Sequence, residues 1–190
     1  AEQFLAKQRR RRRWSPPACV PVPAEERLAL LQRWLPPLRR TLSRHRRVCV
    51  TFVDRPDVLE FVNAKRMPDV ARIGPATPDH MLRTKRLPLI IDLHGRPVQG
   101  LSAEAFVKQV ARYAADHERY FRRCRGPGQT LQDPSPRVIL IPGVGMLTTG
   151  KDLTETEMVA TIYTHAMAIM RGASAAGGYT AVSEREAFGV

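Results

Sequence analysis

Charged and hydroxyl-bearing side chains gather in the stretch from Gly74 to Arg86, which reads GPATPDHMLRTKR. Thr77 followed by Pro78 has the composition of a helix start. The backbone N–H groups of a first helical turn attract anions, and the cations that follow one turn later add to that attraction. We therefore predict a site for a carboxylate or a phosphate. Its candidate residues in this stretch are Thr77, Asp79, His80, Arg83, Thr84 and Lys85.

His80 is the histidine of this stretch, and one histidine alone makes no metal site. The other four show no H-x-H or H-x-x-x-H pairing: His45, His94, His117 and His165. No Ser-His-Asp or Cys-His pattern accompanies them. We interpret His80 as a capping or packing residue, and predict neither a catalytic residue nor a metal site.

A second stretch with phosphate-binding character runs from Gly145 to Lys151 and fits the spacing G-x-x-x-x-G-K. Asp152 then stands where a nucleotide-binding loop has Ser or Thr to reach Mg²⁺. The residues between the glycines, Met146–Thr149, favour a short strand over an anion cradle. Nucleotide hydrolysis is therefore disfavoured.

Gly143 and Gly145 also begin a pattern similar to a dinucleotide fingerprint. The third glycine, Gly150, comes two positions too late for G-x-G-x-x-G. We favour a tight strand-to-strand turn, since glycine is common there. Gly143, Gly145 and Lys151 are kept as further candidates for anion binding.

The elements that would position these residues alternate between strands and helices. The uncharged run Val138–Ile141 is typical of a strand buried on both faces. Strands are also expected at residues 48–53, 89–93, 70–73 and 179–182. Helices are expected at residues 24–43 with a kink or restart at Pro36-Pro37, at 54–64, from 77, at 102–125 and from Thr154, which forms a capping box with Glu157. The order predicts an α/β layered sandwich, with a mixed central sheet and helices on its faces.

The 190 residues suit one domain with an appendage. Residues 1–23 are predicted as a helix tail and an Arg/Pro-rich linker, and residues 24–190 as a single α/β domain. The net charge of +13 leaves a basic nucleic-acid-binding module as an alternative, which no known motif supports. Three unpaired cysteines favour a cytoplasmic setting, and no apolar run approaches a membrane span, so no membrane partner is expected.

The stretches Gly74–Leu89 and Pro136–Asp152 resemble the bifunctional class II aldolase/short-chain dehydrogenase proteins of the rhamnulose-1-phosphate aldolase/lactaldehyde dehydrogenase type. The resemblance covers roughly residues 40–190. It implies a central region of a longer chain that acts in sugar metabolism. Its partners would be a flanking aldolase domain that uses a divalent metal (zinc) and a dehydrogenase domain that binds NAD.

The sequence departs from both catalytic halves of that family. Pro142–Gly145 occupies the position of the Asn-His-Gly segment, so the metal-binding histidine is absent. The dehydrogenase's glycine fingerprint and its Tyr-x-x-x-Lys pair are also missing. The resemblance therefore implies a degenerate aldolase-like domain, non-catalytic and without a cofactor in this chain, that binds a sugar phosphate or another anion. A catalytically competent aldolase-like domain is the alternative, and a homo-oligomer stays open.

Overall fold

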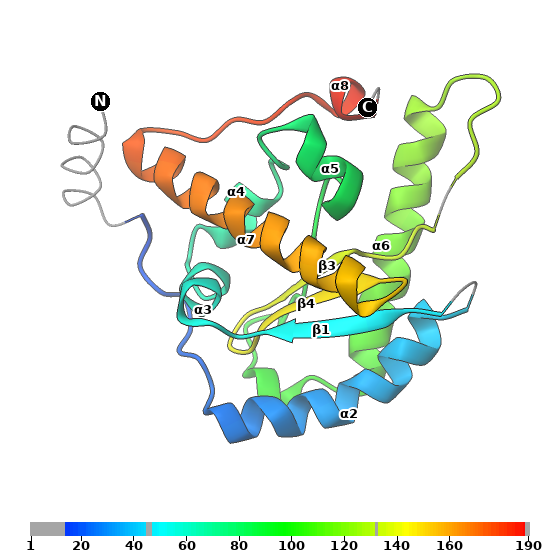
Figure 1. Cartoon of the computed structure of the whole chain (residues 1–190). Coiled ribbons are helices and arrows are strands. Elements are labelled where there is room, and N and C mark those ends of the chain that lie inside the picture. The colour runs from blue at the N-terminus through cyan, green and yellow to red at the C-terminus, as the bar shows by residue number, and fades with distance from the viewer. Residues whose placement is uncertain (1–13, 45–46, 132, 189–190) are drawn as a thin grey trace.

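The computed structural model describes residues 14–44, 47–131 and 133–188. Its centre is a mixed sheet of four strands (Figure 1): β1 (Cys49–Val53), β2 (Leu89–Ile90), β3 (Val138–Ile141) and β4 (Gly145–Gly150). Their order across the sheet is β1-β4-β3-β2. β4 pairs antiparallel with β1 and β3, whereas β2 pairs parallel with β3. The predicted α/β sandwich with a mixed sheet is confirmed.

Helices cover both faces of this sheet. Their bounds are α2 (Ala24–Leu42), α3 (Pro56–Val62), α4 (Met67–Ala71), α5 (Pro78–Thr84), the 3₁₀ helix η1 (Val98–Gly100), α6 (Ala103–Cys124), α7 (Leu153–Ala176) and α8 (Glu184–Phe188). In Figure 1, α7 crosses one face, while α2 and α6 lie on the other. None of the helices in the described part of the chain is long and apolar enough to cross a membrane.

β3 shows why the molecule has three layers. Its four side chains are fully buried and point alternately to the two faces. Val138 and Leu140 join the core beneath α3 and α7, and Ile139 and Ile141 join the core beneath α2 and α6. Each aliphatic side chain buried in this way contributes about 1.5–3 kcal/mol. A strand without any polar residue therefore needs a helical layer on each side.

α2 continues through Pro36-Pro37 as one helix, so the predicted restart is absent, and the alternative of a kink stays a prediction. An interior proline costs a helix about 3 kcal/mol. Trp34 and Leu38, on either side of the pair, are fully buried, and this packing offsets the cost. Leu28, nearer the start of the helix, is 56% exposed.

Two predicted strands are absent from the described structure. Val70 and Ala71 lie in α4, whose first turn contains Pro68. The segment before α8 is not paired with the sheet, and the Tyr179 hydroxyl donates to the carbonyl oxygen of Gly74 at 2.6 Å. Buried apolar residues in runs this short do not by themselves distinguish helix, strand and coil.

The edge strand β2 is shorter than the predicted strand at residues 89–93. The side chain of Gln109 in α6 accepts from the Asp92 N–H at 2.8 Å and donates to the Asp92 carbonyl oxygen at 2.9 Å. Its amide group replaces a strand partner at that position. This arrangement satisfies the backbone at an exposed sheet edge.

The segment before α2 packs against the body of the domain. The Trp14 ring stacks on Phe61, with centroids 5.4 Å apart. The Ala18 N–H donates to the Asn63 carbonyl oxygen at 2.6 Å, and the Val22 N–H donates to that of Gly143 at 2.9 Å. The helix tail predicted for residues 1–8, and the linker as far as residue 13, lie outside the described residues. The boundary at residue 24 stays a prediction.

Candidate functional site: a cationic cleft between α5 and α6

α5 begins where the sequence predicted a helix start. Thr77 has extended backbone angles (φ −131°, ψ 149°) and Pro78 is the first helical residue. The Thr77 side chain accepts no capping hydrogen bond. The side chain of Asp79 lies outside the described part of the structure. The helix is only seven residues long, so its N-terminus has too small a dipole to hold an anion by itself.

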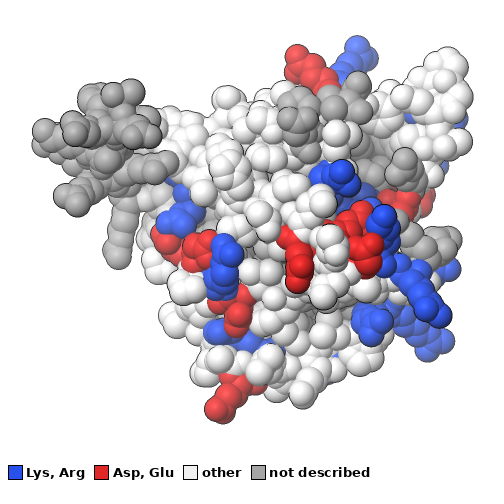
Figure 2. Space-filling view, viewed as in Figure 1, with Lys and Arg blue, Asp and Glu red and all other residues white. Residues whose placement is uncertain are grey.

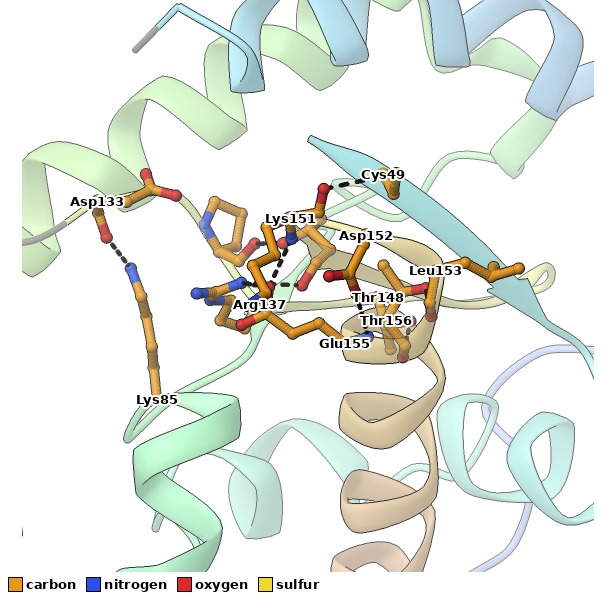
Figure 3. A network of polar contacts seen from close by, with 12 residues as sticks. Cys49, Lys85, Asp133, Arg137, Thr148, Lys151, Asp152, Leu153, Glu155 and Thr156 are labelled. Atoms are coloured by element: carbon orange, nitrogen blue, oxygen red, sulfur yellow. Dashed lines mark hydrogen bonds and ion pairs between the residues drawn. The ribbon is translucent and has the colours of Figure 1, made fainter. Parts of the chain in front are cut away.

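The other end of α5 presents the cations. Thr84 is 1% exposed. Its hydroxyl donates to the nearby carbonyl oxygens of His80 and Lys85, at the end of α5. Lys85 ends the helix with a left-handed backbone (φ 63°). Its Nζ donates to the carbonyl oxygen of Asp133 at 2.6 Å, as Figure 3 shows. Thr84 and Lys85 therefore shape the helix end and tie it to the loop before β3.

A cleft of about 710 Å³ opens beside this helix end, between α5, α6, the loop before β3 and α8. Four cationic and two acidic side chains line it: Arg83, Lys85, Arg86, Arg137, Glu118 and Asp133. Aromatic and aliphatic side chains form the remaining wall: Tyr120, Phe121, Phe188, Met81, Leu82 and Leu131. The excess of positive charge favours an anion.

Arg86 contributes a buried donor to the wall of this cleft. Its Nε is buried and has no hydrogen-bond acceptor among the described residues. Its guanidinium carbon lies 5.9 Å from the centroid of the Tyr120 ring. A buried donor without an acceptor costs about 1–3 kcal/mol. An oxygen of a bound anion at this position would remove that cost.

His117 belongs to the same cleft and is uncharged at neutral pH. The pKa of His117 is lowered to about 4, chiefly by burial and also by the nearby positive charge of Lys85, while Asp133 opposes the shift. The ring stacks on that of Tyr113 at a centroid distance of 6.3 Å. His80, by contrast, packs against α7, where its ring meets that of His165 edge-on at 5.8 Å.

Arg137 connects the cleft to the start of α7 (Figure 3). Its Nη1 lies 3.3 Å from Glu155 Oε2, and both side chains are largely buried. The same Glu155 oxygen accepts from the Lys151 N–H at 2.5 Å. The Lys151 side chain is exposed and does not line the cleft. The contribution of Lys151 to this network is therefore its backbone.

The cap of α7 differs from the predicted one. Asp152, rather than Thr154, is the N-cap, and its Oδ1 accepts from the Glu155 N–H at 2.8 Å. Glu155 Oε2 accepts from the N–H of Lys151, the residue before the N-cap, so this pair of bonds resembles a capping box that begins two residues earlier than predicted. Asp152 is the N-cap because carboxylates cap as well as hydroxyls and β4 ends at Gly150, shortly before it.

The predicted tight turn at Gly143–Gly145 is confirmed, and it lies away from the cleft. Gly143 has φ 83°, and a Cβ at Gly145 would lie 2.6 Å from the carbonyl oxygen of Val53. Lys151 follows the opposite end of β4, whose six residues at about 3.3 Å each separate the ends by roughly 16 Å. The structure therefore brings Arg83 and Lys85 together in the cleft, but neither of the two glycines.

Sequence reasoning missed several residues of this cleft. Arg86 and Arg137 were not among the predicted anion-binding residues. His117 and Tyr120 come from the middle of α6, and Phe188 from α8. Both arginines stand beside the apolar end of a helix or strand. This is the one pattern that could have suggested Arg86 and Arg137.

Residues 14–44, 47–131 and 133–188 offer neither a metal site nor a disulfide. They contain no group of three or more His, Cys, Asp or Glu side chains that could hold a metal ion. The three cysteines, Cys19, Cys49 and Cys124, form no disulfide. In Figure 2, basic side chains gather at the lower right, where α2 ends in Figure 1, and acidic ones occupy the middle of this face. This face carries both signs of charge.

Comparison with known proteins gave two matches. The family described as aldolase class II, second domain, matches residues 29–190. The "Uncharacterized oxidoreductase YuxG" of Bacillus subtilis (strain 168) is 34% identical over 171 residues. That alignment covers 90% of this chain and 25% of the relative, so the chain spans a quarter of the relative's length. No solved structure matches.

Proposed function

The chain belongs to the aldolase class II, second-domain family, and from this premise we propose that it binds a sugar phosphate or a similar anion in the cleft between α5 and α6. We propose further that it is the non-catalytic central domain of a longer chain. The flanking domains would be a metal-dependent aldolase, using zinc, and an NAD-dependent short-chain dehydrogenase. The length of the Bacillus subtilis relative and its name as an oxidoreductase support this arrangement.

The observation that carries the anion site is the buried Nε of Arg86, which has no acceptor among the described residues. Arg83, which also lines the cleft, would supply a second cation. Two charge-assisted hydrogen bonds contribute about 3–6 kcal/mol. This corresponds to a dissociation constant between about 6 mM and about 40 μM.

Titration followed by backbone amide NMR tests the site. The probes are inorganic phosphate, a deoxyketose 1-phosphate and the same sugar without its phosphate. We expect the two phosphate-bearing probes to shift the amides of Lys85, Arg86 and Arg137, and the neutral sugar to shift none of them.

A pair of variants makes the test specific. Arg86→Met should weaken phosphate binding at least about tenfold, since one charge-assisted bond contributes 1.5–3 kcal/mol. Arg39→Met is the control, because Arg39 is exposed on α2 and does not line the cleft. Equal binding by both variants would contradict the assignment.

The non-catalytic role has a separate test. Retro-aldol cleavage of a ketose 1-phosphate is assayed with the 190-residue chain in the presence of zinc. We expect no cleavage above that of zinc alone. Turnover that is lost on removal of zinc would establish the competing interpretation, a competent aldolase-like domain.

A further inference from the structure

α8 lies at the mouth of the cleft and contributes part of its wall. Ala187 and Phe188 line the cleft. The Phe188 ring contacts the rings of Tyr120 and Phe121 on α6, each at a centroid distance of 5.6 Å. These ring contacts therefore link α8 to the residues that would surround a ligand.

The acidic residue of α8 that faces α6 is Glu184. Its Oε1 lies 2.6 Å from Arg123 Nη2, and its carbonyl oxygen accepts from the Tyr120 hydroxyl at 3.4 Å. A smaller hollow of about 150 Å³ adjoins this ion pair, and Arg86, Tyr120, Arg123 and Glu184 are all in its lining. Arg86 lines both this hollow and the larger cleft, whereas Arg123 and Glu184 line the hollow alone. The carboxylate of Glu184 thus lies beside one of the guanidinium groups that would attract an external anion.

The attachment of α8 is weak enough to be reversible. The helix has five residues and none of them is buried. The Arg123 and Glu184 side chains are 60% and 37% exposed, and an ion pair this open to water contributes little to stability. A single helical turn is not stable by itself, so α8 depends on these few contacts. Such segments open locally far more often than the whole domain unfolds.

We propose that residues 184–188 act as an internal acidic and aromatic competitor for the cleft, which an anionic ligand displaces. Glu184 and Phe188 hold α8 against α6, beside the cleft, when no anion is bound. An anion that pairs with the arginines around Tyr120 takes the place of the Glu184 carboxylate, and α8 is released. This inference rests on the proposed function, because it concerns regulation of the same anion site.

Two variants with the same change of charge on α8 test the competition. Glu184→Gln removes the carboxylate that pairs with Arg123. Glu186→Gln is the matched control, because the Glu186 carboxylate accepts from the Ser183 N–H at 2.8 Å and lines neither hollow. We expect phosphate to bind about two- to fivefold more tightly to the Glu184→Gln chain, the range set by an exposed ion pair, and unchanged to the control.

A second measurement follows the release of α8 directly. Trypsin cleaves after Arg185, which lies within α8, and mass spectrometry reports the rate at that bond. Phosphate should accelerate this cleavage in the unsubstituted chain. Glu184→Gln should accelerate it without phosphate, again by about two- to fivefold, and Glu186→Gln should not.

The outcomes separate this inference from the proposed function. Equal phosphate affinity in all three chains, with cleavage after Arg185 unaffected by phosphate, overturns the inference and leaves the anion site standing. Absence of phosphate binding in every chain overturns the proposed function, and the inference with it.

Discussion

His117 illustrates how a single residue takes its properties from the fold. Its ring lies on α6 between the rings of Tyr113 and Tyr120. Burial and the positive charge of Lys85 lower the pKa of His117 to about 4. Nothing in the local sequence around His117 distinguishes it from an exposed histidine. Its neutral state is a consequence of packing between α5 and α6.

This shift predicts a pH dependence of stability. In the unfolded chain His117 titrates near 6.5 and in the folded chain near 4. Between these values the unfolded chain binds a proton that the folded chain does not. The free energy of unfolding should therefore fall as pH falls from about 6.5 towards 4, as measured by urea unfolding. His117→Gln should flatten this slope, whereas His94→Gln, at an exposed site, should not.

The residues of the cleft also show that local sequence does not decide which side chains face a ligand. Arg83 and Lys85 were predicted from their position after a helix start, and they do lie in the cleft. Thr84 was predicted with them, but its buried hydroxyl is used by the end of α5. Which of three neighbouring side chains faces a ligand depends on the direction of the helix, and that direction is set by packing against α7.

At the scale of elements, the junction of β4 and α7 concentrates several interactions in one turn. Asp152 caps α7, and the Glu155 carboxylate accepts from the Lys151 N–H. Arg137, at the start of β3, forms an ion pair with Glu155. The Thr148 hydroxyl also donates to the Thr156 carbonyl oxygen at 2.9 Å. The helix is thereby attached to two strands at its first turn.

Replacing the cap should destabilise the domain measurably. Asp152→Ala removes the acceptor of the Glu155 N–H and should lower the free energy of unfolding by about 1 kcal/mol, within the usual range of 0.5–2. Thr154→Ala serves as the comparison, since Thr154 is exposed and lies inside the helix. Urea unfolding of both variants gives the result. A larger loss at Thr154 would mean that the cap lies there.

At the scale of the whole molecule, the segment before α2 completes the core on the α3 side. Trp14 is 7% exposed, and it belongs to the same buried cluster as Phe61 and Met170. Val20, in the same segment, is 81% exposed. Composition suggested a solvated linker here, because arginines and prolines dominate. The tryptophan provides the apolar area that holds the segment to the domain.

Removal of the Trp14 ring should therefore lower the free energy of unfolding far more than its position beside a basic run suggests. Trp14→Ala should lower the free energy of unfolding by roughly 3–5 kcal/mol, as for other large buried aromatics. Val20→Ala should change it by less than about 0.5 kcal/mol. Thermal or urea unfolding compares the two. Equal stability of both variants would show that residues 14–23 are not part of the folded unit.

The sequence by itself determined the features that depend on neighbours along the chain. The uncharged run at β3, the glycine turn after it, the long helix at α6 and the Thr77-Pro78 start of α5 were all predicted, because periodicity and backbone preference act over a few residues. These features were enough for the α/β class.

Only the tertiary structure decided where the candidate site lies. Lys85, His117, Arg137 and Phe188 are far apart along the chain and line one cleft. They meet because β2 pairs parallel with β3, and α6 crosses between these strands while α8 returns to α6. The burial that shifts the pKa of His117 and isolates the Arg86 Nε arises from that crossing. No local pattern encodes it, since it depends on which distant surfaces pack together.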